Sequence, residues 1–143
     1  MKLWKHPATL EGLNNMNENT MADALGIVFT EIGEDFLVAT MPVNSNTVQP
    51  FRILHGGANV ALAETMGSVA STLCVEDWTS QTAVGLEINA NHLKSVKEGA
   101  MVTGTCRAIR VGRQVHVWQI EICDEKGDLS CVSRLTVSIV AHR

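Results

Sequence analysis

Hydrophobic and polar positions alternate along much of the second half of the chain, with the two-residue period of a β-strand. The pattern predicts strands at 83–92, 101–111, 115–123 and 135–139. In the first of these segments, strict alternation places one set of side chains on one face: Val84, Leu86, Ile88, Ala90 and His92. Segments 26–32 and 36–43 flank the turn residues Gly33, Glu34 and Asp35 and predict an earlier hairpin. Most connections are too short for parallel crossovers, so we expect a largely antiparallel sheet.

One long apolar segment departs from this alternation. From residue 57 to about residue 76 the chain is rich in alanine and lacks proline, which favours a helix over a strand. Its apolar positions lie nearly all round the helix, so other structure has to enclose it. Shorter helical segments are expected at 9–16 and 20–23, where Thr20 and Asp23 have the spacing of a capping box. A buried helix against an antiparallel sheet is an α+β domain, and 143 residues suit one domain, 1–143.

Composition narrows the classes of function. Eleven Lys and Arg face 15 Asp and Glu, and the net charge of −4 argues against a nucleic-acid partner. The apolar segment carries too many polar residues for a membrane span, and the N-terminus lacks the apolar region of a signal peptide. We therefore expect a cytoplasmic protein with no membrane partner. The four cysteines show no Cys-x-x-Cys spacing, which favours free thiols over a metal site.

A single acid interrupts the apolar segment. Between Ile53 and Val75 the only formally charged side chain is Glu64. A buried carboxylate is costly unless it is paired, and burial raises the pKa of a carboxyl group. Two interpretations follow: Glu64 lies exposed on a thin polar stripe with Ser68 and Ser71, or it is a functional acid to which Ser68, one turn later, can donate a hydrogen bond.

The start of the same helix offers a second candidate group. His55, Gly56 and Gly57 are an ordinary loop-to-helix junction, or they present free amides at the positive end of the helix dipole to a carbonyl oxygen gaining charge. A carboxylate and such a donor suggest acyl transfer to water. Glu64 lies about 10 Å along the axis from Gly57, however, and a reacting carbonyl needs both groups at about 3 Å. Two antiparallel helices about a twofold axis would meet this requirement, and we therefore predict a homodimer with shared active sites.

Several short motifs together resemble the hotdog-fold thioesterases. They are Met41-Pro42-Val43, Gln49-Pro50-Phe51, Leu54-His55-Gly56-Gly57, Ala63-Glu64-Thr65, the run from Gly85 to His92, and Val117-Trp118-Gln119-Ile120. The similarity extends from about Trp4 to Ile139 and is greatest to the bacterial branch of the menaquinone and enterobactin pathways. The resemblance implies a long helix wrapped by an antiparallel sheet and a homodimer that commonly forms a homotetramer. It also implies hydrolysis of acyl-CoA or aroyl-CoA, 1,4-dihydroxy-2-naphthoyl-CoA among them, with no metal ion or other cofactor.

Roles for individual residues follow from this resemblance. Glu64 matches the catalytic carboxylate, either nucleophile or general base, and the Gly56 amide matches the group that polarises the thioester carbonyl. Gln49 and His55 match residues that position the carbonyl and the water, and Ser68 supports the leaving-group side. The residues that match the substrate-binding pattern for CoA are Gly85, His92, Leu93, Lys94, Ser95, Arg110, Val111, Gly112, Arg113, Gln114 and Val115. Among them, the basic side chains of Lys94, Arg110 and Arg113 suit the phosphates of the nucleotide.

Two positions depart from the family pattern, and two other functions compete with hydrolysis. Arg52 stands where close relatives often have glycine, which puts the shape of the acyl pocket in doubt, and Asn44 stands where aspartate is usual.

Thioesters of acyl carrier protein are a further substrate class. The alternatives are a hotdog hydroxyacyl dehydratase, which also pairs an acid with a histidine, and a non-catalytic acyl-CoA-binding module.

Overall fold

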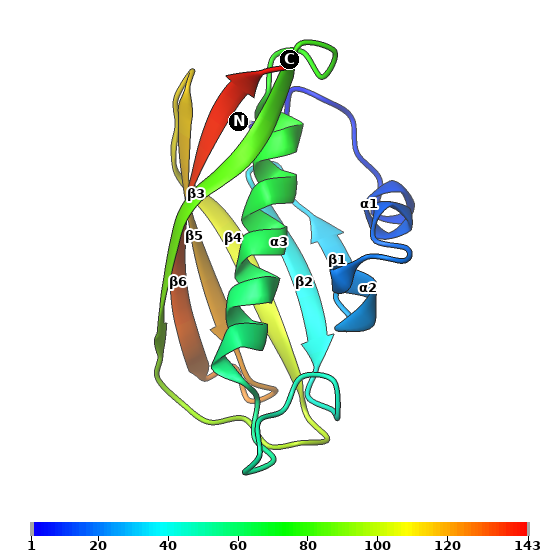
Figure 1. The fold of residues 1–143 in the computed structure, drawn as a ribbon, viewed down its shortest axis with the longest axis vertical. Helices are drawn as coiled ribbons and strands as arrows, with labels where there is room; N and C mark the ends of the chain where they lie inside the picture. Colours follow the sequence, from blue (N-terminus) through cyan, green and yellow to red (C-terminus); the bar gives the residue numbers. More distant parts are fainter. Residues whose placement is uncertain (1, 143) are drawn as a thin grey trace.

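The structure is a computed structural model that describes residues 2–142. In it, one long helix lies along one face of a curved sheet (Figure 1). The elements in chain order are α1 (Leu10–Met16), α2 (Met21–Ala24), β1 (Val28–Ile32), β2 (Phe36–Pro42), α3 (Gly56–Cys74), β3 (Gln81–His92), β4 (Met101–Val111), β5 (Val115–Cys123) and β6 (Leu129–Ala141). The α+β architecture expected from the sequence is confirmed. Among the described residues, none of the helices is long and apolar enough to cross a membrane.

The six strands form one antiparallel sheet in the order β1-β2-β4-β5-β6-β3. Hairpins connect β1 to β2, β4 to β5 and β5 to β6, as their short connections require. The two edge strands differ greatly in length, because β1 has 5 residues and β3 has 12. One side of β3 pairs with β6, and no other strand of residues 2–142 pairs with its second side.

A β-bulge in β3 corrects the face assignment made from strict alternation. The register with β6 shifts between Gly85 and Glu87, so one extra residue lies in β3 at this point. Before the bulge Ala83 packs against the core, and after it Ile88 and Ala90 do so. Val84 and Leu86 therefore do not share a buried face with Ile88, and their exposed fractions are 45% and 62%.

Helix α3 supplies the centre of the core. Leu62, Met66 and Ala70 are fully buried against the sheet, and each large apolar side chain removed from water stabilises the fold by about 1.5–3 kcal/mol. The helix ends at Cys74, two residues before the predicted end, because Val75 adopts an extended backbone. The expectation that α3 is enclosed all round is met on one side only. Its other side carries the exposed Glu64 and a half-buried Val60 within a single chain.

Two smaller expectations also meet the structure. The Thr20 side chain does not cap α2; it donates instead to the carbonyl of Asn17, and the Asp23 carboxylate accepts from the Asn19 amide. The four cysteines are free thiols, and three of them are buried. Burial raises the pKa of the Cys74 thiol to about 11, which keeps it protonated at neutral pH.

Candidate active site

The first turn of α3 leaves one backbone donor free. His55 precedes the helix in an extended conformation, and its Nδ1 accepts a hydrogen bond of 2.8 Å from the Gly57 amide. The amides of Ala58 and Asn59 donate to the His55 carbonyl. Within residues 2–142 no acceptor meets the Gly56 amide, which is therefore the available donor at the positive end of the helix dipole.

A cavity of about 360 Å³ opens at this end of α3. Six of the predicted site residues line it: Gln49, Gly56, His92, Leu93, Lys94 and Ser95. His92 lies directly beside the helix start, because a Cβ on Gly56 would come within 2.9 Å of its Nε2. Only glycine therefore leaves His92 where it is. The structure thus brings residues of the loop, the helix start and the end of β3 together at one place.

Sequence reasoning missed Asn59, which lines the same cavity. It is 5% exposed, and its Nδ2 lies 3.4 Å from Nδ1 of His92, while its Oδ1 has no hydrogen-bond partner in the described part of the chain. The available signal was position: Asn59 follows His55 by four residues, which places both on one face of the first turn.

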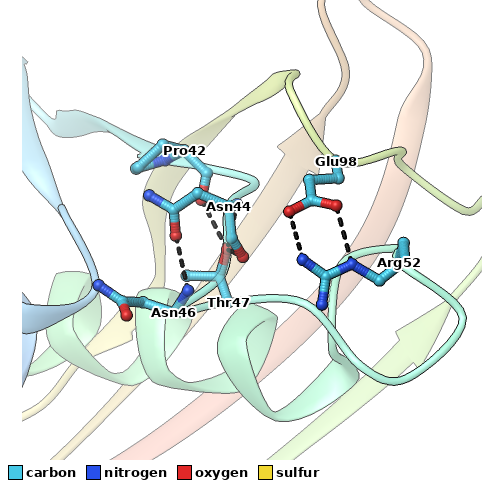
Figure 2. A network of polar contacts seen from close by, with 6 residues as sticks. All are labelled: Pro42, Asn44, Asn46, Thr47, Arg52 and Glu98. Atoms are coloured by element: carbon cyan, nitrogen blue, oxygen red, sulfur yellow. Dashed lines mark hydrogen bonds and ion pairs between the residues drawn. The ribbon is translucent and has the colours of Figure 1, made fainter.

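Two hydrogen-bond networks hold the loop that brings Gln49 to the cavity (Figure 2). Thr47 donates to the carbonyl of Pro42 and accepts from the amide of Asn44, and the Asn44 side-chain oxygen accepts from the amide of Asn46. An aspartate could accept the same bond, so Asn44 preserves the turn. The Gln49 side-chain oxygen in turn accepts from the Phe51 amide, which fixes its orientation.

Arg52 belongs to the second network and points away from the cavity. Its guanidinium pairs with the carboxylate of Glu98 through two hydrogen bonds, one of them 2.9 Å long (Figure 2). Its backbone φ of 63° lies in the left-handed region, a conformation that glycine adopts without strain and other residues adopt rarely. Arg52 does not line the cavity beside Gly56, so its side chain does not shape that cavity.

Lys94 reaches the cavity but already has two carboxylate partners. Its ammonium lies 2.6 Å from both Asp124 and Asp128, and these hydrogen bonds raise the pKa of Lys94. A phosphate would have to compete with them for this cation.

Glu64 occupies a second place, in the middle of α3. Its carboxylate lies over the backbone of β3, where a Cβ on Gly85 would come within 2.8 Å of Oε1. The alternative of an exposed polar stripe is met in part: Glu64 is exposed and Ser68 is half-buried, whereas Ser71 is fully buried. No hydrogen bond joins Ser68 to Glu64 among the described side chains.

The turn 110–115, between β4 and β5, occupies a third place at the far end of α3. Gly112 and Arg113 line a small cavity together with Cys74 and Val75, the residues at which the helix stops. A helix of 19 residues is about 28 Å long. Arg110 and Arg113 are exposed and have no ion-pair partner within the described range. One chain thus separates the predicted site residues into three groups along α3.

An apolar cavity of about 390 Å³ lies between α1 and α3. Its lining residues are mostly hydrophobic and come from the segment before α1, from both helices and from the loop after α3: Pro7, Ala8, Thr9, Gly12, Leu13, Met16, Val69, Thr72, Leu73 and Trp78. Such a cavity suits an uncharged, bulky group.

Comparison with known proteins identifies the family. Residues 51–131 match the family model described as the thioesterase superfamily. The chain belongs to the thioesterase superfamily. It is 56% identical to the 1,4-dihydroxy-2-naphthoyl-CoA hydrolase of Escherichia coli (strain K12), over 138 residues that make up 96% of this chain and 99% of that protein. It is 49% identical to a proofreading thioesterase of Cronobacter sakazakii, with 96% of this chain and 98% of that protein covered.

Solved structures give the same result for the fold. A crystal structure of a thioesterase variant from Pseudomonas aeruginosa superposes with a TM-score of 0.95 at 47% identity, covering 99% of this chain and 100% of that chain. The hotdog fold expected from the resemblance is confirmed, and this thioesterase is a thioester hydrolase. Its relatives favour neither the dehydratase nor the non-catalytic interpretation.

Proposed function

We propose that this thioesterase hydrolyses an aroyl-CoA or acyl-CoA, with 1,4-dihydroxy-2-naphthoyl-CoA as the first substrate to test. The near-complete alignment with the Escherichia coli hydrolase of that name, at 56% identity, supports this choice. The apolar cavity between α1 and α3 offers a place for the aromatic acyl group, because it lies beside Val69 and Thr72, one to two turns beyond Glu64. Free thiols at all four cysteines fit the cytoplasm as the place of action.

The observation that carries the proposal is the free Gly56 amide at the start of the same helix that exposes the Glu64 carboxylate at its middle. The amide donates to the thioester carbonyl oxygen as it gains charge. As a general base, Glu64 takes a proton from the attacking water, the water oxygen bonds to the carbonyl carbon, the C–S bond breaks, and the proton passes to the leaving sulfur. As a nucleophile, Glu64 forms an anhydride as the C–S bond breaks; water then hydrolyses the anhydride, which frees Glu64 and supplies the proton of the CoA thiol. Gln49 and His55 border the carbonyl, and Ser68 lies one turn beyond Glu64 toward the leaving group.

These groups meet only if two chains share their sites. For the partner's Glu64 to lie level with Gly57, a twofold axis must pass level with Val60 and Ala61, which are half-buried in a single chain. Where α3 packs on β3, Glu64 lies beside Gly85 and Gly56 lies beside His92. The same axis therefore passes between Ile88 and Asn89 of β3.

The free edge of β3 suits such a dimer. An unpaired strand of 12 residues presents a row of backbone donors and acceptors that pairs readily with another strand. Antiparallel pairing of two β3 strands about this axis brings Gly85 opposite the partner's His92 and extends the sheet across both chains. Large apolar side chains on this strand and directly after it are exposed in the single chain: Val84, Leu86 and Leu93. Two such dimers would form the expected tetramer.

Replacing Glu64 tests the proposed chemistry. Glu64→Ala and Glu64→Gln should lower kcat for 1,4-dihydroxy-2-naphthoyl-CoA by about 10²–10⁴-fold, because they remove the acid–base or nucleophilic group. KM and the thermal midpoint should change little, since CoA is bound elsewhere. Thiol release measured with a chromogenic reagent reports the rate, and Glu121→Gln, an exposed change on β5, is the matched control. A kcat within tenfold of wild type for Glu64→Ala would remove the acid from the mechanism.

A further inference from the structure

A buried polar cluster joins α3 to the turn 110–115. Ser71 on α3 and the ring of His116 on β5 are 0% and 2% exposed, and Trp118 beside them is fully buried. The Trp118 Nε1 donates to the Ser71 hydroxyl at 2.7 Å, and the His116 Nδ1 lies 3.0 Å from the same oxygen. The His116 ring also hydrogen-bonds to the backbone of Gly112. We call Trp118, Ser71, His116 and the Gly112 carbonyl the Ser71 cluster.

The chemistry of these groups sets the direction of each bond. An indole nitrogen only donates, so the Ser71 oxygen accepts from Trp118 and its own hydrogen is left for Nδ1 of His116. A neutral imidazole that accepts at Nδ1 carries its hydrogen on Nε2, which leaves Nε2 to donate to the Gly112 carbonyl. Burial lowers the pKa of His116 and thereby favours this neutral form. The result is a one-way chain of hydrogen bonds that runs from the sheet through the helix to the turn.

The position of the turn 110–115 determines where two exposed arginines lie. Arg110 and Arg113 flank Gly112, are exposed, and have no ion-pair partner among residues 2–142. The Gly112 amide donates to the Val115 carbonyl, and the Gln114 carbonyl accepts from the Ile139 amide. These bonds fix the base of the turn to the sheet, whereas the His116 ring is the side chain that links Gly112 to α3.

We propose that His116 is a positioning residue that sets the turn 110–115 against α3 so that its two arginines meet the phosphates of the CoA nucleotide. The inference rests on the proposed function, because it takes CoA as the ligand. His116 touches neither the nucleotide nor the thioester. Its loss should therefore weaken recognition of the nucleotide and leave the chemical step alone.

Substitutions of matched length separate the two hydrogen bonds of the ring. In His116→Gln the side-chain amide reaches the place of Nε2 and can still donate to Gly112. In His116→Asn the amide lies at the place of Nδ1 and keeps only the bond to Ser71. His116→Leu removes both bonds. Ser71→Ala, a smaller change, tests the helix side of the cluster if the leucine variant does not fold.

The experiment compares substrates with and without the nucleotide, using benzoyl-CoA and the benzoyl thioester of N-acetylcysteamine. For His116→Leu, KM for benzoyl-CoA should rise about tenfold, the effect of one lost charge-assisted contact. Its kcat, and kcat/KM for the short thioester, should stay within about twofold. His116→Gln should lie closer to wild type than His116→Asn. Equal losses on both substrates, or no loss on benzoyl-CoA, would overturn the assignment.

Calorimetric binding of CoA itself separates this inference from the proposed function. If wild type binds CoA but hydrolyses neither thioester, the proposed function fails. The inference about His116 then stands or falls on whether the Kd for CoA rises about tenfold in His116→Leu. An unchanged Kd for CoA would refute it in every case.

Discussion

Gly85 lies where any side chain would collide with the proposed catalytic carboxylate. A Cβ at this position would come within 2.8 Å of the Glu64 Oε1, closer than real Cβ contacts allow. The backbone of β3 therefore acts as a surface on which the carboxylate rests. Gly85 is therefore explained by the close approach of another group to the strand and not by a turn.

Gly85→Ala should lower kcat by about 10-fold to 10²-fold, because displacement of a reacting group by about 1 Å has effects of that size. The fold should remain, since the contact is made with the flexible end of an exposed side chain. Steady-state thiol release and a thermal melt measure the two properties. Thr82→Ala, an exposed change on the same strand, serves as the control. Unchanged kcat would show that the Glu64 carboxylate works from some other position.

Among the elements, β3 shows what periodicity can and cannot predict. The strand itself was predicted, since alternation over ten residues is a strong signal. The bulge was not, because one extra residue leaves alternation intact on both sides and is fixed only by the pairing with β6. Similarly, the long apolar segment with one acid predicted the helix α3. Which face of α3 the sheet leaves uncovered could not be predicted, because it depends on the curvature of the sheet.

The site residues show the same difference between local sequence patterns, which can be predicted, and long-range contacts, which cannot. Candidates in contiguous motifs, such as Gly56 at the helix start and His92 at the end of β3, could be named from the sequence, and these two line one cavity. Asn59 and His116 could not, because their roles arise from contacts with residues 33 and 45 positions away.

The contact between α3 and β5 should make stability depend on pH. Burial, and then the charge of Lys5, hold the pKa of His116 below its ordinary value of 6.5. Below about that pH the unfolded chain binds more protons than the folded one, so the free energy of unfolding falls as pH drops. Urea unfolding from pH 7.5 to pH 5 should show a steeper loss in wild type than in His116→Gln, whose side chain does not titrate.

Neighbouring groups do not confuse this comparison. Lys5, Cys74, Glu76 and Arg113 line the small cavity beside the ring and are present in both proteins. Parallel stability curves for wild type and His116→Gln would mean that His116 keeps an ordinary pKa in the folded chain.

At the scale of the whole molecule, a single chain holds three separated parts of the predicted site along a helix of about 28 Å. The arrangement makes sense for a twofold dimer in which the first turn of one helix lies level with the middle of the other. Each chain then contributes to two sites, and neither site belongs to one chain.

Mixing two inactive variants tests this arrangement. Glu64→Ala lacks the acid. Gly56→Pro lacks the free amide, at a first helical position where the proline backbone is tolerated, and it also displaces His92 of the same chain. If the two variants are refolded together in equal amounts, half of the dimers should contain one chain of each variant. Each mixed dimer would hold one intact site of two, so about a quarter of wild-type activity should return. Each variant refolded alone is the control. Activity no higher than that of the separate variants would place both groups of a site on the same chain.

In the proposed dimer, pairing through the open edge of β3 also makes the active state depend on protein concentration. Below the dissociation constant of the dimer, each chain would carry fragments of two sites and complete neither, so specific activity should fall on dilution without any unfolding. The same dissociation would uncover 12 residues of unpaired strand, with Val84 and Leu86 exposed beside it. Inactivation by dilution and loss of protein to aggregates would thus have one origin, and acyl-CoA that bridges two chains should protect against both.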